Sequence, residues 1–115
     1  MNNGFFRVAA VVPRVTLADP VANAKDITEV FARLESAGVD LAVFPELSVT
    51  GYSCGDLFHS SLLLDAAGKA LSEIAAATAG KHLTAIVGCP VRVGSGLYNC
   101  GVAVAGGKIL AVVPK

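Results

Sequence analysis

Two charged residues follow apolar segments of this chain in a way that could place them in a reaction site. Glu46 comes just after the run Leu41–Phe44, and Lys115 comes just after Ile109–Val113. Such runs predict buried strands, and open α/β sheets bind ligands at the carboxyl ends of their strands. A carboxylate delivered there is a candidate general base. If the two charges face each other, each keeps the other ionised, and the lysine can polarise a bound carbonyl.

Each charge also has an ordinary explanation. A carboxylate after a strand end is commonly solvated, and a lone lysine after a strand is commonly part of a solvated tail. Pro45 favours the functional interpretation of Glu46, because it fixes the direction of the backbone. Residues 47–51 are expected to keep the segment after Glu46 packed.

The three cysteines are weaker candidates. Cys89 and Cys100 fall in predicted strands, where a buried cysteine behaves as a small hydrophobe. Cys54 falls in the loop after Glu46, where it could be exposed, but a loop thiol is a nucleophile only when its pKa is depressed. We assign none of them a catalytic role. An odd number of widely spaced cysteines without a C-x-x-C motif indicates free thiols in a reducing cytoplasm.

No metal or cofactor site is predicted within the chain. His59 and His82 are isolated from any partner with metal-ligand spacing. The stretch Gly106–Ile109 resembles a phosphate loop only superficially, because it lacks the required glycine spacing and has isoleucine where a magnesium-binding hydroxyl belongs.

The remaining sequence predicts an α/β domain with a mixed sheet. Asp19 and Pro20 are typical of a helix start, and Gly38 and Gly80 of helix ends. Gly106–Gly107 suits the tight turn of a hairpin. The predicted strands are Phe5–Val12, Leu41–Phe44, Leu83–Cys89, Tyr98–Ala105 and Lys108–Val113; the predicted helices are Asp19–Gly38 and Ser61–Ala79, and Pro45–Phe58 is a predicted loop.

Composition restricts the classes of partner. The 115 residues allow one domain at most, and 54% of them are hydrophobic. The mean hydropathy of +0.65 is high for so small a chain, which predicts a surface that another part of the protein or a partner covers. Nine basic residues balance nine acidic ones, so nucleic acid and anionic membranes are not favoured partners. We expect no signal peptide and no membrane span.

Several motifs resemble the nitrilase (carbon–nitrogen hydrolase) superfamily, and they extend along essentially the whole chain. A further stretch, with Gly51-Tyr52 and Asp56-Leu57-Phe58, is similar to the glutaminase domains of the glutamine-dependent NAD⁺ synthetase family. The motifs are Arg7–Ala10, Asp19–Asn23, Leu41–Leu47, Ser48–Phe58, Leu97–Asn99 and Val112–Lys115.

The resemblance implies a Glu-Lys-Cys triad in which Glu46 is the general base and Lys115 stabilises the oxyanion. The nucleophilic cysteine of the family matches none of the three here and is expected beyond Lys115. Gly55 stands where many relatives carry an acidic residue, and this difference puts little of the resemblance in doubt. Residues 1–115 would then be the N-terminal part of a glutaminase domain that hydrolyses glutamine. A separate synthetase domain would bind ATP and magnesium, and the whole would be a cytoplasmic homo-oligomer.

The resemblance also implies a fold, a four-layer α-β-β-α sandwich of which this chain supplies part. Both helices should cover the outer face of one sheet, and the inner face should pack on a second sheet. Two alternatives stay open. One is a plain amidase of the same superfamily without a synthetase domain, and the other is a non-catalytic α/β module whose apolar face docks on a partner.

Overall fold

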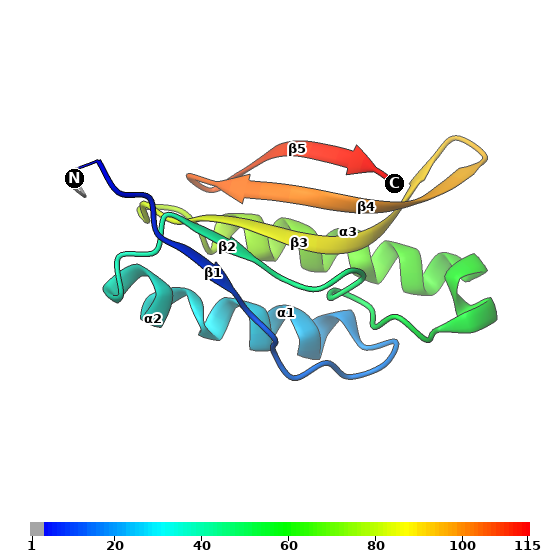
Figure 1. Cartoon of the computed structure of the whole chain (residues 1–115). Helices are drawn as coiled ribbons and strands as arrows, with labels where there is room; N and C mark the ends of the chain where they lie inside the picture. Colours follow the sequence, from blue (N-terminus) through cyan, green and yellow to red (C-terminus); the bar gives the residue numbers. More distant parts are fainter. Residues whose placement is uncertain (1–3) are drawn as a thin grey trace.

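The sheet and its helices follow the predicted α/β order in the computed structural model, which describes residues 4–115 (Figure 1). A five-stranded sheet has the order β1-β2-β3-β4-β5. In chain order the elements are β1 Val8–Ala10, α1 Pro20–Glu29, α2 Phe31–Ser36, β2 Leu41–Val43, the 3₁₀ helix η1 Gly55–His59, α3 Ser61–Ala76, β3 Thr84–Val93, β4 Gly96–Ala105 and β5 Lys108–Pro114.

The sheet is mixed, as predicted. Strands β1, β2 and β3 are parallel, and the helices lie in the crossovers between them. Strands β3, β4 and β5 are joined by hairpins and are antiparallel. Because β5 is antiparallel to β4, and β4 to β3, β5 runs in the same direction as β2. The carboxyl ends of β2 and β5 therefore lie at the same edge of the sheet.

The helices begin where the sequence predicts. Oδ1 of Asp19 accepts a hydrogen bond from the amide of Ala22 at 3.1 Å, and Pro20 occupies the first helical position. Ser60 caps α3 through the amide of Leu63 at 3.4 Å. The single helix predicted up to Gly38 is instead two helices, α1 and α2, that meet at Val30.

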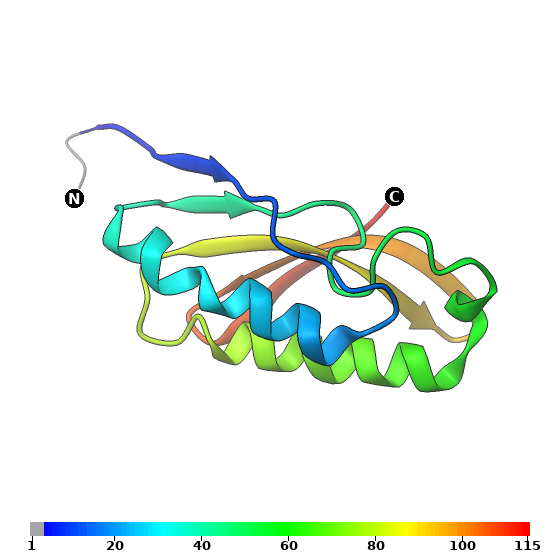
Figure 2. The ribbon, with the colours of Figure 1, turned by 90° about the horizontal axis from the view of Figure 1, so that it is seen from below.

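The core lies between the sheet and the helices, which cover the same face of it (Figure 2). The predicted face of the second helix is buried throughout: Leu64, Ala67, Leu71, Ile74 and Thr78. Ile27 and Phe31 pack from α1 and α2 into the same cluster. Burying an aliphatic or aromatic side chain of this size stabilises the fold by about 1.5–3 kcal/mol. This packing holds β2 and β3 rigidly in place.

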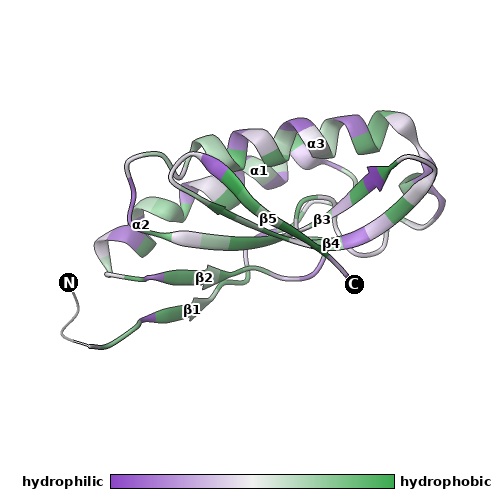
Figure 3. Ribbon diagram, turned by 90° about the horizontal axis from the view of Figure 1, so that it is seen from above, coloured by the Kyte–Doolittle hydropathy of each residue, from purple (hydrophilic) through white to green (hydrophobic). Residues whose placement is uncertain are grey.

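The opposite face of the sheet, which we call the open face, carries no helix (Figures 1 and 3). Because this face is uncovered, the predictions that the strands Phe5–Val12 and Lys108–Val113 are buried are wrong. β1 is a short edge strand, with Phe5 78% and Val12 87% exposed beside it. All of β5 is exposed at the other edge, although its residues are largely apolar. An edge strand has one neighbour, and the helices here cover one face. The predicted second sheet lies outside these residues and stays a prediction.

The hairpin between β4 and β5 is confirmed. Gly106 and Gly107 have φ angles of 58° and 80°, as a primed two-residue turn requires. The amide of Gly107 donates to Oγ1 of Thr78 at 2.9 Å, so the turn is fastened to the end of α3. These glycines therefore form a hairpin turn and no phosphate loop.

Candidate active site

Residues 45–51, which we call the elbow, carry Glu46 from the end of β2 onto β3. The amide of Phe44 donates to the carbonyl of Ile86 at 2.8 Å, just before the elbow begins. Gly88 then holds the elbow on both sides. Its amide donates to Oγ of Ser48 at 3.1 Å, and its carbonyl accepts from the amide of Val49 at 2.9 Å. The elbow is therefore fixed to the sheet although it has no regular secondary structure.

Gly88 also allows the elbow to touch β3. A Cβ atom at this position would lie 2.2 Å from the amide nitrogen of Leu47 and 2.7 Å from the carbonyl oxygen of Pro45. Leu47 itself has a φ angle of 52°, in the left-handed region that few side chains adopt. The sharp turn and the missing side chain together place Glu46 at the carboxyl ends of the strands.

A buried asparagine supports the elbow from the other side. The side-chain amide of Asn23 donates to the carbonyls of Val49, at 2.9 Å, and Thr16, at 2.8 Å. Its Oδ1 accepts from the amide of Thr16 at 2.7 Å. Asn23 is fully buried on α1, so the helix layer and the elbow share one hydrogen-bond network.

The structure brings Glu46 and Lys115 together. Nζ of Lys115 donates to Oε1 of Glu46 at 2.9 Å, and the amide of Lys115 donates to the carbonyl of Asn99 at 2.9 Å. Glu46 leaves β2 and Lys115 leaves β5, and these strands end at the same edge of the sheet. Their catalytic roles stay predictions, but the fold does make the two charges face each other, which the sequence left as a possibility.

Each charge shifts the pKa of the other. The hydrogen bond and charge of Lys115 lower the pKa of Glu46 against an opposing effect of burial, and a hydrogen bond from the Asn99 side chain lowers it further. The hydrogen bond and charge of Glu46 raise the pKa of Lys115. Both groups are thus ionised at neutral pH, which a general base and an oxyanion-stabilising cation require.

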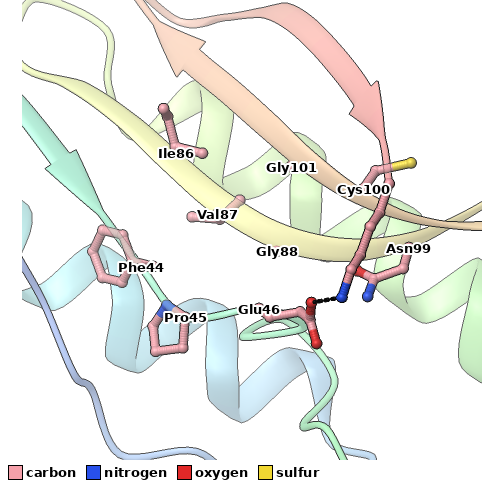
Figure 4. Close-up of a pocket in the computed structure, with 10 residues that line it drawn as sticks. Phe44, Pro45, Glu46, Ile86, Val87, Gly88, Asn99, Cys100 and Gly101 are labelled. Carbon is pink, nitrogen blue, oxygen red and sulfur yellow. Dashed lines mark hydrogen bonds and ion pairs between the residues drawn. The ribbon is translucent and has the colours of Figure 1, made fainter.

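A cavity of about 230 Å³ opens beside the pair (Figure 4). Gly88 and Gly101 are register partners on β3 and β4, and both line it. Their missing side chains leave room for a small molecule next to the carboxylate and the ammonium. The cavity is lined by Phe44, Pro45, Glu46, Ile86, Val87, Gly88, Asn99, Cys100, Gly101 and Lys115.

The cysteines are poor nucleophiles in this structure. Cys54 is buried, so the expectation that it could be exposed is wrong; its thiol donates to the carbonyl of Thr50 at 3.4 Å. Burial raises the pKa of Cys89 to about 12. Cys100 lines the cavity, but burial raises its pKa as well. Protonated thiols are weak nucleophiles.

Sequence reasoning missed two residues of this site, Gly88 and Asn99. A glycine inside a predicted strand signals a close backbone approach, and that signal was available at Gly88. Asn99 belongs to the Leu97–Asn99 motif, which was noticed without being given a role.

The histidines lie apart from this site. His82 precedes β3, and its Nε2 contacts Oδ1 of Asp40, at the edge of the sheet opposite to Glu46. Among residues 4–115, no three His, Cys, Asp or Glu side chains gather closely enough to hold a metal ion. No helix in that range combines the length and apolar character needed to cross a membrane.

Comparison with known proteins agrees with the fold and the motifs. Residues 7–114 match the carbon-nitrogen hydrolase family. Glutamine-dependent NAD(+) synthetase of Mycobacterium tuberculosis is 39% identical over 114 residues, which are 99% of this chain and 17% of that protein. The corresponding protein of Mycobacterium leprae is 35% identical over 114 residues, with the same coverage. The chain thus spans about a sixth of the length of these curated relatives.

Solved structures give the same result. A glutamine-dependent NAD(+) synthetase from Cytophaga hutchinsonii superposes with a TM-score of 0.85 and 30% identity, over 93% of this chain and 18% of that one. An amidase from Nesterenkonia sp. superposes with a TM-score of 0.74 and 23% identity, over 96% of this chain and 42% of that one, which supports the fold alone. The predicted nitrilase-type α/β fold is therefore confirmed, and the chain belongs to the carbon–nitrogen hydrolase family.

Proposed function

We propose that this chain is part of the glutaminase domain of a glutamine-dependent NAD⁺ synthetase. The observation that carries the proposal is the ion pair between Glu46 and Lys115 at the edge of a cavity. The identity to glutamine-dependent synthetases supports glutamine as the amide. ATP and magnesium would bind outside these residues, in the synthetase domain, and we assign no residue of this chain to either.

Glu46 acts as the general base in the proposed reaction. Its carboxylate takes the proton of a cysteine thiol, and the thiolate attacks the side-chain carbonyl carbon of glutamine. Lys115 stabilises the negative charge that develops on the carbonyl oxygen. When the C–N bond breaks, Glu46 gives its proton to the leaving nitrogen, and ammonia departs from a glutamyl thioester.

Water completes the cycle. Glu46 takes a proton from the water molecule that attacks the thioester and returns it to the sulfur, which releases glutamate and restores the thiol. We propose that the nucleophilic cysteine lies outside residues 1–115. The raised pKa values of Cys89 and Cys100 and the burial of Cys54 support this assignment.

The test is Glu46→Gln in the full-length protein that carries this chain. NAD⁺ formation is measured with glutamine and, separately, with added ammonia. We expect the glutamine-dependent rate to fall by about 10²–10⁴-fold, the usual contribution of a general base, while the ammonia-dependent rate stays unchanged. Glu35→Gln is the matched control, because it makes the same chemical change at the opposite edge of the sheet, and it should leave both rates unaltered.

Other outcomes separate the alternatives. An unchanged glutamine-dependent rate in Glu46→Gln would overturn the proposal and favour a non-catalytic module. Amide hydrolysis without NAD⁺ formation from ammonia would identify a plain amidase. Abolition of the glutamine-dependent rate by Cys100→Ser would place the nucleophile inside this chain and contradict its assignment to another segment.

A further inference from the structure

Asn99 is bonded to Lys115 through its backbone and shares the cavity with Glu46. Its backbone carbonyl accepts the amide of Lys115 at 2.9 Å, which fixes the end of β5 against β4. Its side chain lines the same cavity as Glu46 and Lys115, and its amide helps to lower the pKa of Glu46. Asn99 therefore lies next to two residues that are far apart in sequence and leave different strands.

The alternation of β4 explains why Asn99 reaches this position. Cys100, Val102 and Val104 are buried toward the helices, so the side chains of Asn99 and Ala103 point to the open face. The Glu46 elbow crosses that face next to Gly88. Asn99 lines the cavity together with Glu46, and Figure 4 shows its side chain close to the contact between Glu46 and the Lys115 ammonium.

The chemistry of the amide suits this position. A neutral NH₂ group donates to a carboxylate without competing for its proton, and a carbonyl oxygen is available to an ammonium. A carboxylate that exchanged protons in each turnover would keep its orientation through such a partner. A second charged side chain in the same place would oppose one of the two charges.

We propose that Asn99 is a positioning residue, which holds the Glu46 carboxylate and the Lys115 ammonium at a fixed spacing and orientation beside the cavity. This inference rests on the proposed glutaminase function and deepens it. Asn99 takes no proton and forms no bond to substrate. It acts through Glu46 and Lys115.

The experiment measures glutaminase kinetics against pH in the full-length protein, for Asn99→Ala and Asn99→Asp. Asn99→Ala should lower kcat by about 10–100-fold with less than about a threefold change in KM, since small misplacements of reacting groups have effects of this size. The acid limb of the kcat/KM profile should move to higher pH, because Glu46 loses a partner that favours its ionised form. Asn99→Asp keeps the side-chain shape and should move that limb further upward, because it adds a like charge.

Leu97→Ala is the matched control, since Leu97 points to the same face of the same strand and is not among the residues that line the cavity. It should keep the parent pH profile. The inference would be overturned if both Asn99 variants kept the kinetics and the acid limb of the parent protein and Glu46→Gln still abolished activity. If Glu46→Gln left the activity intact, the proposed function would fail first and the inference with it.

Discussion

Carboxylates lie at both edges of the parallel strands, but they are bound in different ways. At the amino ends of the strands, the carboxylates accept backbone amides. Glu35 accepts from the amides of His82 at 2.7 Å and Leu83 at 3.0 Å, and Asp40 accepts from the amide of Arg7 at 2.7 Å. These bonds join β1, β2 and β3 to one another and to α2.

At the carboxyl ends, Glu46 is held by a side chain. Its carboxylate accepts from Nζ of Lys115 at 2.9 Å, and the nearby Asn99 side chain helps to lower its pKa. Carboxylates that accept backbone amides hold the strand ends together, although Asp40 also contacts the side chain of His82. The Glu46 carboxylate is bonded to a side chain beside a cavity, where a small molecule could reach it. The comparison teaches that the partners of a carboxylate, more than its burial, distinguish one that holds the sheet from one proposed to act as a base.

The largest effect should follow from Lys115→Met, which removes the positive charge of the Glu46–Lys115 ion pair and leaves the sheet intact. We expect glutamine hydrolysis by the full-length protein to fall by about 10²–10³-fold, as on loss of an oxyanion-stabilising group. The midpoint of thermal unfolding should change only slightly, since Lys115 is largely exposed. Lys108→Met, at the other end of β5, is the control. Equal losses in the two variants would contradict the assignment.

The next largest effect should come from Gly88, the residue of β3 against which the elbow packs. Gly88→Ala should destabilise the protein by about 1–3 kcal/mol, as overpacking does, and should also lower activity because the elbow carries Glu46. Its register partner gives the control, since a Cβ at Gly101 would lie 3.8 Å from the side chain of Ile86, an ordinary contact. Denaturant unfolding of both variants measures the difference. Equal stability of the two would show that the elbow does not depend on Gly88.

Substitutions at the amino ends of the strands should lower stability and leave catalysis unchanged. Asp40→Ala leaves the amide of Arg7 without this acceptor, and we expect a loss of about 1–3 kcal/mol of stability with kcat unchanged. Asp65→Ala, on the exposed face of α3, should change neither quantity. A fall in kcat of more than about tenfold in folded Asp40→Ala would break the distinction between the two edges.

The smallest effect concerns pH. The lowered pKa of Glu46 means that its contribution to stability is present above the unfolded pKa and lost as pH falls through the folded pKa. The raised pKa of Lys115 means that its contribution is present below the unfolded pKa and lost as pH rises through the folded pKa. Unfolding midpoints of the parent and Glu46→Gln should therefore differ slightly and constantly between roughly pH 5 and pH 10, and converge outside that range. A difference that changed near pH 7 would implicate another group.

The sequence predicted the elements and singled out the two charged residues, because both depend on local signals; that the two charges meet depends on the order of the strands. Asp19 and Pro20 indicate a helix start, and Glu46 and Lys115 each follow an apolar run. Exposure could not be predicted in the same way. The apolar sequences of β5 and β3 are similar and predict the same burial, but the burial of a strand depends on which elements lie above and beside it. The burial of Cys54 depends on the turns of residues 47–54, which no short-range pattern specifies.

The network around Asn23 has a consequence for how this chain tolerates changes in length. Val49 has its amide bonded to β3 and its carbonyl to Asn23 of α1, and the amides of Ser48, Thr50 and Gly51 are bonded within the elbow. These amide protons should therefore exchange with solvent as slowly as those of a core strand. One extra residue between Glu46 and Gly51 would break several of these bonds at once. Insertions in homologous chains should therefore begin only past Tyr52, where the backbone returns to the surface.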